Sequence, residues 1–247
     1  MKRRPRFQGF HPEAFRFFRR LARSNHKTWF DRNRGLYQEH VMGALRALFE
    51  ELVPVMLELD PDVEISGRVG RNFSRINRDI RFRPDKAPYR TNLYLFCGDR
   101  RREARDARLY LGLSGEGVTC GFAAYGGRDS ALEQNLKPRR QENPQALERF
   151  LRRLLLRGKR SGQGGYETYW HATERGKWKK HPGWPQTEKD WKRCRAFVVR
   201  RKFPATRRAL RSPRFARTLE GVFCRLFPLY AFTVVDGRPG EQALKRI

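Results

Sequence analysis

Apolar residues recur at helical spacing in four parts of the chain. The first predicted helix begins at Pro12, a residue typical of a first helical turn. The second begins near Thr28, and Pro54 is expected to end or kink it. The third covers residues 144–156, and the fourth follows Ser212, which is placed as its N-cap. Each of these helices has one apolar face, so each is expected to pack against a core.

Elsewhere the apolar pattern changes to a period of two, which is typical of strands. The expected strands are residues 63–65, 73–82, 91–96 and 196–199. Residues 107–127 contain two further β-rich runs around Ser114-Gly115-Glu116-Gly117, which is a strong hairpin signal. Strands that follow one another this closely pair most economically as antiparallel neighbours. The pattern therefore predicts an α+β fold, a single domain with a central, mainly antiparallel sheet flanked by helices.

The aromatic residues are spread over the whole length, so neither half has the composition of a disordered tail. A hydrophobic content of 38% over 247 residues is enough for one sizeable core. We expect a basic N-terminal extension at residues 1–6, a single domain at residues 7–235 and a C-terminal tail at residues 236–247.

Charge separates this chain from an average protein. The 55 Lys and Arg residues exceed the 26 Asp and Glu residues by 29, and residues 137–225 alone hold 26 basic and seven acidic residues. Such a field attracts polyanions, so nucleic acid or another phosphate-bearing ligand is an expected partner. The alternative is a solvated basic surface without a dedicated partner, because 43 of the 55 basic residues are Arg and a GC-rich genome also produces that bias.

Several classes of protein lack their usual signals in this sequence. The four cysteines and five histidines show no zinc spacing, so neither disulfides nor structural zinc are expected, and no metal-site residues are assigned. The sequence contains no P-loop and no dinucleotide fingerprint. It therefore does not tell whether the protein uses a cofactor, which stays unknown. No apolar segment follows the basic N-terminus, and no stretch approaches the ~20 apolar residues of a membrane helix. We expect a cytoplasmic protein that does not contact a membrane.

Residues 72–92, which read NFSRINRDIRFRPDKAPYRTN, are the most unusual segment. In an extended strand, alternate side chains face opposite ways. One face would carry Arg75, Asn77, Asp79 and Arg81, and the other Ile76, Arg78, Ile80 and Phe82. A carboxylate between two guanidiniums stays ionised, which makes Asp79 an orienting group rather than a proton donor. An arginine turned toward the core, as Arg78 would be, requires an acidic or carbonyl partner.

Asp85 and Lys86 follow in a turn that Pro84 and Pro88 make stiff. A group of cationic side chains at a fixed place suits a phosphate, sulfate or carboxylate. The predicted anion-binding residues are Arg75, Arg78, Arg81, Lys86, Tyr89 and Arg90. Asp79, Asp85 and Lys86 are the candidates for any catalytic role, the two aspartates as orienters or metal ligands. The structural alternative is a set of ion pairs that fixes strand register, with Asp85 capping a turn.

The same segment resembles the signature RxxRDxRFxxDKxxY of the bacterial domain-of-unknown-function 2461 family. The matching residues are Arg75, Arg78, Asp79, Arg81, Phe82, Asp85, Lys86 and Tyr89. Further similarities are NHKTWF at residues 25–30, Gly126-Gly127 and FPLY at residues 227–230, so the resemblance covers roughly residues 7 to 232. It implies an α+β domain, and it implies no activity because the family is uncharacterised.

Residues 166–191 combine tryptophans with lysines and arginines. Trp178 and Trp184 are candidates for stacking on nucleic-acid bases, although tryptophans in such segments are more often core anchors. Three functions therefore remain open: an anion-binding domain for nucleic acid or a phosphate-bearing ligand, an enzyme acting on a phosphate ester or phosphodiester, and an interaction protein with no chemistry. The sequence does not decide whether the protein is an enzyme.

Overall fold

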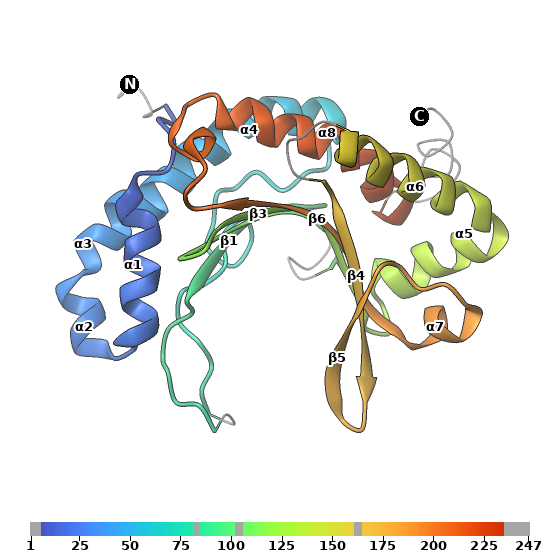
Figure 1. The fold of residues 1–247 in the computed structure, drawn as a ribbon, viewed down its shortest axis with the longest axis horizontal. Helices are drawn as coiled ribbons and strands as arrows, with labels where there is room; N and C mark the ends of the chain where they lie inside the picture. The colour runs from blue at the N-terminus through green and yellow to red at the C-terminus, as the bar shows by residue number, and fades with distance from the viewer. Residues whose placement is uncertain (1–5, 82–83, 102–105, 161–164, 235–247) are drawn as a thin grey trace. The chain divides into compact units, whose positions relative to one another are not determined.

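The computed structural model of the chain describes residues 6–81, 84–101, 106–160 and 165–234 (Figure 1). Within these ranges the strands form one six-stranded antiparallel sheet in the order β1-β2-β3-β6-β4-β5. The strands are β1 (Asn92–Cys97), β2 (Arg108–Ser114), β3 (Gly117–Tyr125), β4 (Glu167–Glu174), β5 (Lys177–Pro182) and β6 (Cys194–Pro204). The predicted α+β class, with helices and a mainly antiparallel sheet, is confirmed.

The chain divides into two compact units, each built from several stretches of sequence. The first consists of Met1–Cys97, Leu111–Thr119 and Phe203–Gly221. The second consists of Gly98–Tyr110, Cys120–Lys202 and Val222–Ile247. The predicted domain limits stay a prediction, because most of the expected extension and the whole expected tail lie outside the described residues.

The helices of the first unit bury a cluster of aromatic rings. They are α1 (Pro12–Arg23), α2 (Lys27–Arg32), α3 (Arg34–Leu36), the π-helix η1 (Tyr37–Gly43), α4 (Ala44–Leu59) and the short 3-10 helix η3 (Arg208–Arg211). Helix α1 starts as predicted at Pro12, and the imidazole Nδ1 of His11 caps it by accepting a hydrogen bond from the Glu13 amide. His26 caps α2 in the same way, through the Trp29 amide.

The sequence predicted that Pro54 would end or kink its helix; α4 does not end there but continues through Pro54 to Leu59. A proline inside a helix removes one hydrogen bond and costs roughly 3 kcal/mol. Leu52 and Met56, on either side of Pro54, are both fully buried. Because the apolar face continues past the proline, packing outweighs the missing hydrogen bond.

Two of the expected strands are loop segments with isolated bridges. β1 and the β2–β3 hairpin form where predicted, but residues 63–65 and 73–81 join no named strand, and Phe82, the last residue of the second predicted strand, lies outside the described residues. Phe73 bridges Leu95 of β1, and Asn77 bridges Tyr89. Proline has no amide hydrogen to donate, so the arm that carries Pro84 and Pro88 forms only an interrupted ladder with residues 73–81.

The second unit contains the β4–β5 hairpin, a long two-stranded ribbon in Figure 1. Its connection is Arg175-Gly176, and both residues have positive φ, 49° and 74°, as a type I′ turn requires. The sequence predicted no strand here. The predicted strand at residues 196–199 forms the centre of the longer β6.

The remaining helices are the π-helix η2 (Leu132–Leu136), α5 (Lys137–Glu142), α6 (Pro144–Arg160), α7 (Glu188–Arg193) and α8 (Phe215–Val234), of which α8 has residues in both units. Among them, α6 and α8 correspond to predicted helices with shifted ends, whereas η2, α5 and α7 were not predicted. Helix α6 continues to Arg160, past the predicted end at residue 156. Ser212 caps the turn before α8 through its hydroxyl, which accepts from the Arg214 amide. In the described part of the chain, no helix has the length and apolar character needed to cross a membrane.

Candidate functional site

The signature segment forms a loop with two extended arms. The arms are joined by hydrogen bonds from the Arg78 amide to the Pro88 carbonyl and from the Arg90 amide to the Ile76 carbonyl, both 2.8 Å long. Side chains alternate along the first arm as the sequence predicted. The exposed set is Arg75, Asn77, Asp79 and Arg81, and the half-buried set is Ile76, Arg78 and Ile80. Phe82, which was expected in the second set, lies outside the described residues.

Tyr89 anchors the second arm. Its ring stacks on Phe30 of α2, with the centroids 4.2 Å apart. Its amide donates to Asn25 Oδ1 at 3.0 Å, and its carbonyl accepts from Asn25 Nδ2 at 2.9 Å. Burial and the negative charge of Asp31 raise the pKa of Tyr89, and Arg34 opposes them only in part. The two segments that carry the family resemblance, residues 25–30 and 72–92, therefore meet at this tyrosine.

Arg78 closes the loop from the half-buried side. Its Nη1 donates to Asp85 Oδ2 at 2.7 Å and to the Ala87 carbonyl at 3.1 Å. Asp85 Oδ1 also accepts from the Ala87 amide at 2.9 Å. This is the acidic and carbonyl partnership that an arginine turned toward the core requires. Asp85 consequently holds the turn and neutralises Arg78 at the same time.

Asp79 and Arg81 form a second, exposed pair. Arg81 donates from Nε to Asp79 Oδ1 at 3.0 Å and from Nη2 to Oδ2 at 2.8 Å, and the hydrogen bonding to Asp79 raises the pKa of Arg81. Lys86 donates to the Ile80 carbonyl at 3.3 Å. Each candidate catalytic carboxylate, Asp79 and Asp85, is thus engaged by a different arginine. Across the described residues, no three His, Cys, Asp or Glu side chains are grouped as a metal site would need.

Residues 64–75, which we call the arginine loop, lead into the signature. Asn72 is completely buried at its centre. Its Oδ1 accepts from the Gly67 amide at 2.8 Å, and its Nδ2 donates to the carbonyls of Glu64 at 2.7 Å and Phe96 at 3.1 Å. The side-chain amide of Asn72 therefore satisfies backbone groups that would hydrogen-bond to a neighbouring strand in a sheet. These hydrogen bonds give the loop a defined shape.

Arginine side chains surround this loop. Arg46 of α4 donates to the Gly67 carbonyl at 3.4 Å and lies over the Phe73 ring, 5.4 Å from its centroid. The guanidinium of Arg75 lies against Gly70, where a methyl group would be 4.0 Å from its Nε and Nη2 atoms. Gly70 has a φ of +95°, which side chains rarely adopt, so the backbone conformation of the turn favours glycine here.

Glu64 is the acidic residue of the arginine loop. Its Oε2 lies 3.8 Å from Nε of Arg71. Burial favours the protonated acid, but hydrogen bonds from Ser66 and the charges of Arg71 and Arg68 outweigh it and lower the pKa of Glu64. The loop therefore presents one ionised carboxylate against Arg68, Arg71 and Arg75, with Arg46 adjoining.

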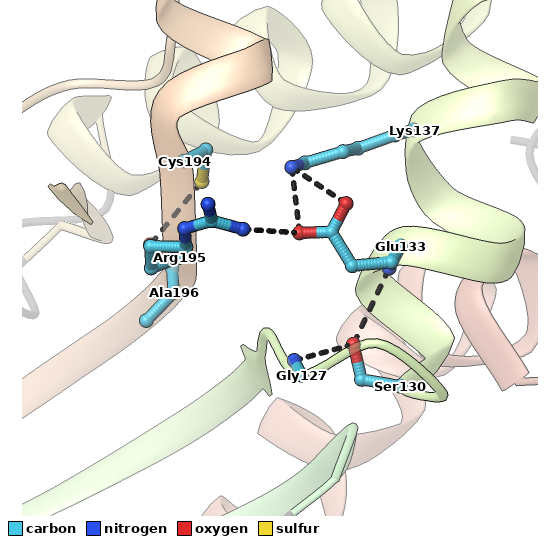
Figure 2. Close-up of polar contacts among 7 residues, drawn as sticks. All are labelled: Gly127, Ser130, Glu133, Lys137, Cys194, Arg195 and Ala196. Carbon is cyan, nitrogen blue, oxygen red and sulfur yellow. Dashed lines mark hydrogen bonds and ion pairs between the residues drawn. The ribbon is translucent and has the colours of Figure 1, made fainter. Parts of the chain in front are cut away.

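A separate ionic cluster lies in the second unit (Figure 2). Glu133 accepts from Nζ of Lys137 at 2.7 and 2.9 Å and from Nη1 of Arg195 at 3.4 Å. The hydroxyl of Ser130 accepts from the amides of Gly127 at 3.1 Å and Glu133 at 3.4 Å. These groups bind one another and join the turn after β3 to η2 and β6, which suits a structural role.

The tryptophans of residues 166–191 fall into two groups. Trp170 and Trp191 are buried core anchors, each at most 5% exposed. Trp178 lies on β5 and is 57% exposed, whereas Trp184 is half-buried in the loop that follows. No ring contact joins Trp178 to Trp184, so the two candidates for base stacking are not neighbours in one aromatic cluster.

Buried cysteines are unsuited to nucleophilic chemistry here. Burial raises the pKa of Cys97, Cys120 and Cys194 to about 12. Near neutral pH these three side chains are thiols, and the thiolate is the reactive form of cysteine.

Fold and site together define an α+β protein with a strongly basic surface loop held by buried asparagine and tyrosine side chains. The family model described as "Conserved hypothetical protein (DUF2461)" matches residues 13–232, and the chain belongs to this family. No curated protein matches the chain. The family match covers the signature, the arginine loop that leads into it, and residues 25–30, which contact it at Tyr89.

Sequence reasoning found the signature but missed the residues that organise it. Asn25 was noted only as part of a family resemblance, and Asn72 only as the start of the unusual segment. Arg68 and Arg71 were not singled out. The available signal was the spacing Gly67-Arg-Val-Gly70, since two glycines that bracket an arginine favour a turn displaying that side chain.

Proposed function

We propose that the protein binds the phosphate groups of a polyanion through the arginine loop, and that nucleic acid is the polyanion. The net charge of +29 supports this class of partner, because the surrounding field concentrates anions at the surface before any contact forms. Phosphate-bearing small ligands share the same chemistry and are covered by the test below.

Arg75 is the observation that carries the proposal. Its side chain is exposed, and no ion pair or hydrogen bond joins it to another described residue. Arg68 and Arg71 lie on the same loop, which contains one carboxylate. A planar guanidinium offers a fork of donors that matches two phosphate oxygens, so an exposed arginine such as Arg75, on a loop of defined shape, suits phosphate recognition.

In this proposal the arginine loop makes the phosphate contacts, and the rest of the signature supports it. Tyr89 and the Arg78–Asp85 pair fix the arms, while Arg81, Lys86 and Arg90 add positive charge. Residues 64–90 hold eight basic and three acidic residues, a net charge of +5. Direct anion contacts by these signature residues stay a prediction.

The enzymatic alternative receives no comparable support. Asp79 and Asp85 each accept hydrogen bonds from an arginine, so both candidate catalytic carboxylates are already engaged. A reaction on a phosphate ester would need one of these groups released from its partner. Phosphate binding requires no such rearrangement.

The test compares two double variants of equal charge. In the first, Arg68→Gln and Arg75→Gln remove two cations of the arginine loop. In the control, Arg23→Gln and Arg32→Gln remove two exposed cations from α1 and α2. Binding of a labelled oligonucleotide is measured by fluorescence anisotropy over a range of NaCl concentrations, with inorganic phosphate as competitor.

Each phosphate contact contributes roughly 0.7–0.9 to the slope of log affinity against log salt. Removing two contacts should lower that slope by about 1.5 and weaken binding by about tenfold or more near 0.1 M salt. The control should change the slope far less. Equal losses in both double variants would show that the arginine loop has no special role.

A further inference from the structure

The β4–β5 hairpin presents two faces of different character. In the register of the hairpin, Trp178 is opposite Thr173 and Lys180 is opposite His171. Directly paired residues point to the same side of a sheet, as do residues two apart on one strand. We call this side the Trp178 face; its residues are Tyr169, His171, Thr173, Trp178, Lys180 and, from the neighbouring β6, Arg200.

The opposite face is packed and electrically balanced. Trp170 and Ala172 are buried there, and Trp170 stacks on His181 with centroids 4.2 Å apart. Near the turn, Glu174 neutralises Lys179 at 3.0 Å and also contacts His181 and Arg193. The carboxylate of Glu174 thus forms ion pairs with the basic residues of this face.

On the Trp178 face the cations gather around a tyrosine. Nζ of Lys180 lies 4.1 Å and Cζ of Arg200 lies 4.7 Å from the centroid of the Tyr169 ring. Arg200 also bonds Glu167, which it shares with Lys202. Lys180 has no carboxylate partner among the described residues. One cation of this face is therefore held in place with its charge uncompensated.

Trp178 is the exposed aromatic group beside these cations. It is 57% exposed, and its ring lies 5.4 Å from that of His171. β5 is the last strand of the sheet, where lysines commonly prevent association of edge strands. Edge protection accounts for the lysines, but it does not account for a large exposed indole among them, because an exposed apolar ring favours association.

His171 supports an aromatic rather than a charged surface at this place. Burial first, and then the charges of Lys180, His181 and Arg200, lower the pKa of His171. The imidazole is consequently uncharged near neutral pH, and its Nδ1 is buried without a hydrogen-bond partner. Trp178 and the neutral His171 ring together form an apolar aromatic surface bordered by Lys180.

We propose that the Trp178 face binds single-stranded nucleic acid, with an unpaired base stacking on Trp178 and adjoining phosphates contacting Lys180 and Arg200. Aromatic rings beside cations in a sheet are the usual platform for unpaired bases, and every base offers a flat face to stack. A duplex keeps its bases stacked on each other, so it lacks the surface that Trp178 recognises. The Trp178 face belongs to the second compact unit and does not depend on the arginine loop.

The test measures the affinity of single strands and duplexes of equal length, as both DNA and RNA, for four forms of the full chain. These are the wild type, Trp178→Ala, Trp178→Phe and Lys177→Gln. Lys177 is exposed on the same strand and opposite Glu174, so its substitution removes charge from the other face. Thermal unfolding confirms that each variant folds, which the exposure of both side chains favours.

Trp178→Ala should weaken single-strand binding by about tenfold, the usual value of one stacked base, and should change duplex binding much less. Trp178→Phe should restore most of the affinity because it keeps a flat ring. Lys177→Gln should lower single-strand and duplex binding by the same small factor.

The proposal is overturned if Trp178→Ala and Lys177→Gln bind single strands alike, or if Trp178→Ala weakens both forms equally. Because the arginine-loop variants leave Trp178 intact, they distinguish the two proposals. A loss of salt-dependent binding in those variants, with the single-strand preference kept, would support both.

Discussion

Two asparagine side chains hold the loops around the signature. Asn25 bonds both the amide and the carbonyl of Tyr89, and Asn72 bonds one amide and two carbonyls of neighbouring segments. An asparagine amide offers two donors and one acceptor group, so it pairs with backbone as another backbone segment would. Aspartate, which only accepts when ionised, lacks the donors that Asn72 uses.

Substitution Asn72→Ala should therefore destabilise the protein strongly. It leaves the Gly67 amide and the carbonyls of Glu64 and Phe96 without their partner in a buried place. Each buried polar group left unsatisfied costs about 1–3 kcal/mol, so a total loss of about 3 kcal/mol is expected. Urea denaturation followed by fluorescence measures this loss.

Asn77→Ala is the matched control, because Asn77 lies in the same segment with an exposed side chain. Its substitution should change the free energy of unfolding by no more than about 0.5 kcal/mol. If Asn72→Ala unfolds at the same urea concentration as Asn77→Ala, the buried amide does not organise the arginine loop.

At the scale of elements, the two hairpins show which strands could be predicted from the sequence and which could not. The β2–β3 hairpin was predicted because both of its strands are apolar around a glycine-rich turn. The β4–β5 hairpin was missed although Arg175-Gly176 is a two-residue turn signal. β5 is an edge strand whose side chains are exposed on both faces, so it shows no hydrophobic alternation. An argument from the hydrophobic pattern finds only strands with at least one buried face.

The signature shows the same limit for the candidate site. Alternation along residues 75–81 correctly separated the exposed from the half-buried side chains. The partners of these side chains did not follow from alternation. Arg78 finds Asp85 seven residues later, and Tyr89 finds Asn25 from 64 residues away. Such pairs depend on which segments of the chain the fold brings together, and the spacing of residues within one segment does not encode this.

Gly176 should be essential to the β4–β5 turn because of its backbone conformation alone. Its φ is +74°, and an added methyl group would meet nothing within 4 Å. Gly176→Ala should therefore destabilise the protein through the left-handed conformation, by about 1 kcal/mol. Gly35 in α3 is equally unobstructed and has ordinary helical geometry.

Gly35→Ala should have the opposite effect and stabilise the protein by about 0.5–1 kcal/mol, because alanine favours helix and reduces the freedom of the unfolded chain. Thermal unfolding of both variants gives the comparison. A Gly176→Ala variant as stable as the wild type would show that the turn relaxes to another conformation.

At the scale of the whole molecule, the excess of 29 positive charges has a thermodynamic consequence. Carboxylates are too few to pair with 55 cations, and several of them serve two or three partners, as Glu174 and Glu133 do. Net repulsion among the remaining cations opposes the compact state. Such a protein gains stability when its charge is screened, and gains more when specific anions occupy its surface.

Thermal unfolding in salt and in a polyanion separates these two effects. Raising NaCl from about 0.01 to 0.1 M shortens the Debye length from about 30 to 10 Å, so the melting temperature should rise for every variant that keeps the charge. A short oligonucleotide at about one hundred times its Kd should add about 2.7 kcal/mol at constant ionic strength, which is a further rise of roughly 5–10 °C.

The double variants then show whether the oligonucleotide binds a specific surface or is attracted only by the overall positive charge. If the positive charge has no specific partner, the oligonucleotide should stabilise the wild type and the two charge-matched double variants alike. If the arginine loop binds phosphate, the rise should shrink for Arg68→Gln with Arg75→Gln and persist for Arg23→Gln with Arg32→Gln. Both double variants lower the net charge from +29 to +27, so repulsion is relieved equally and only the position of the removed arginines differs.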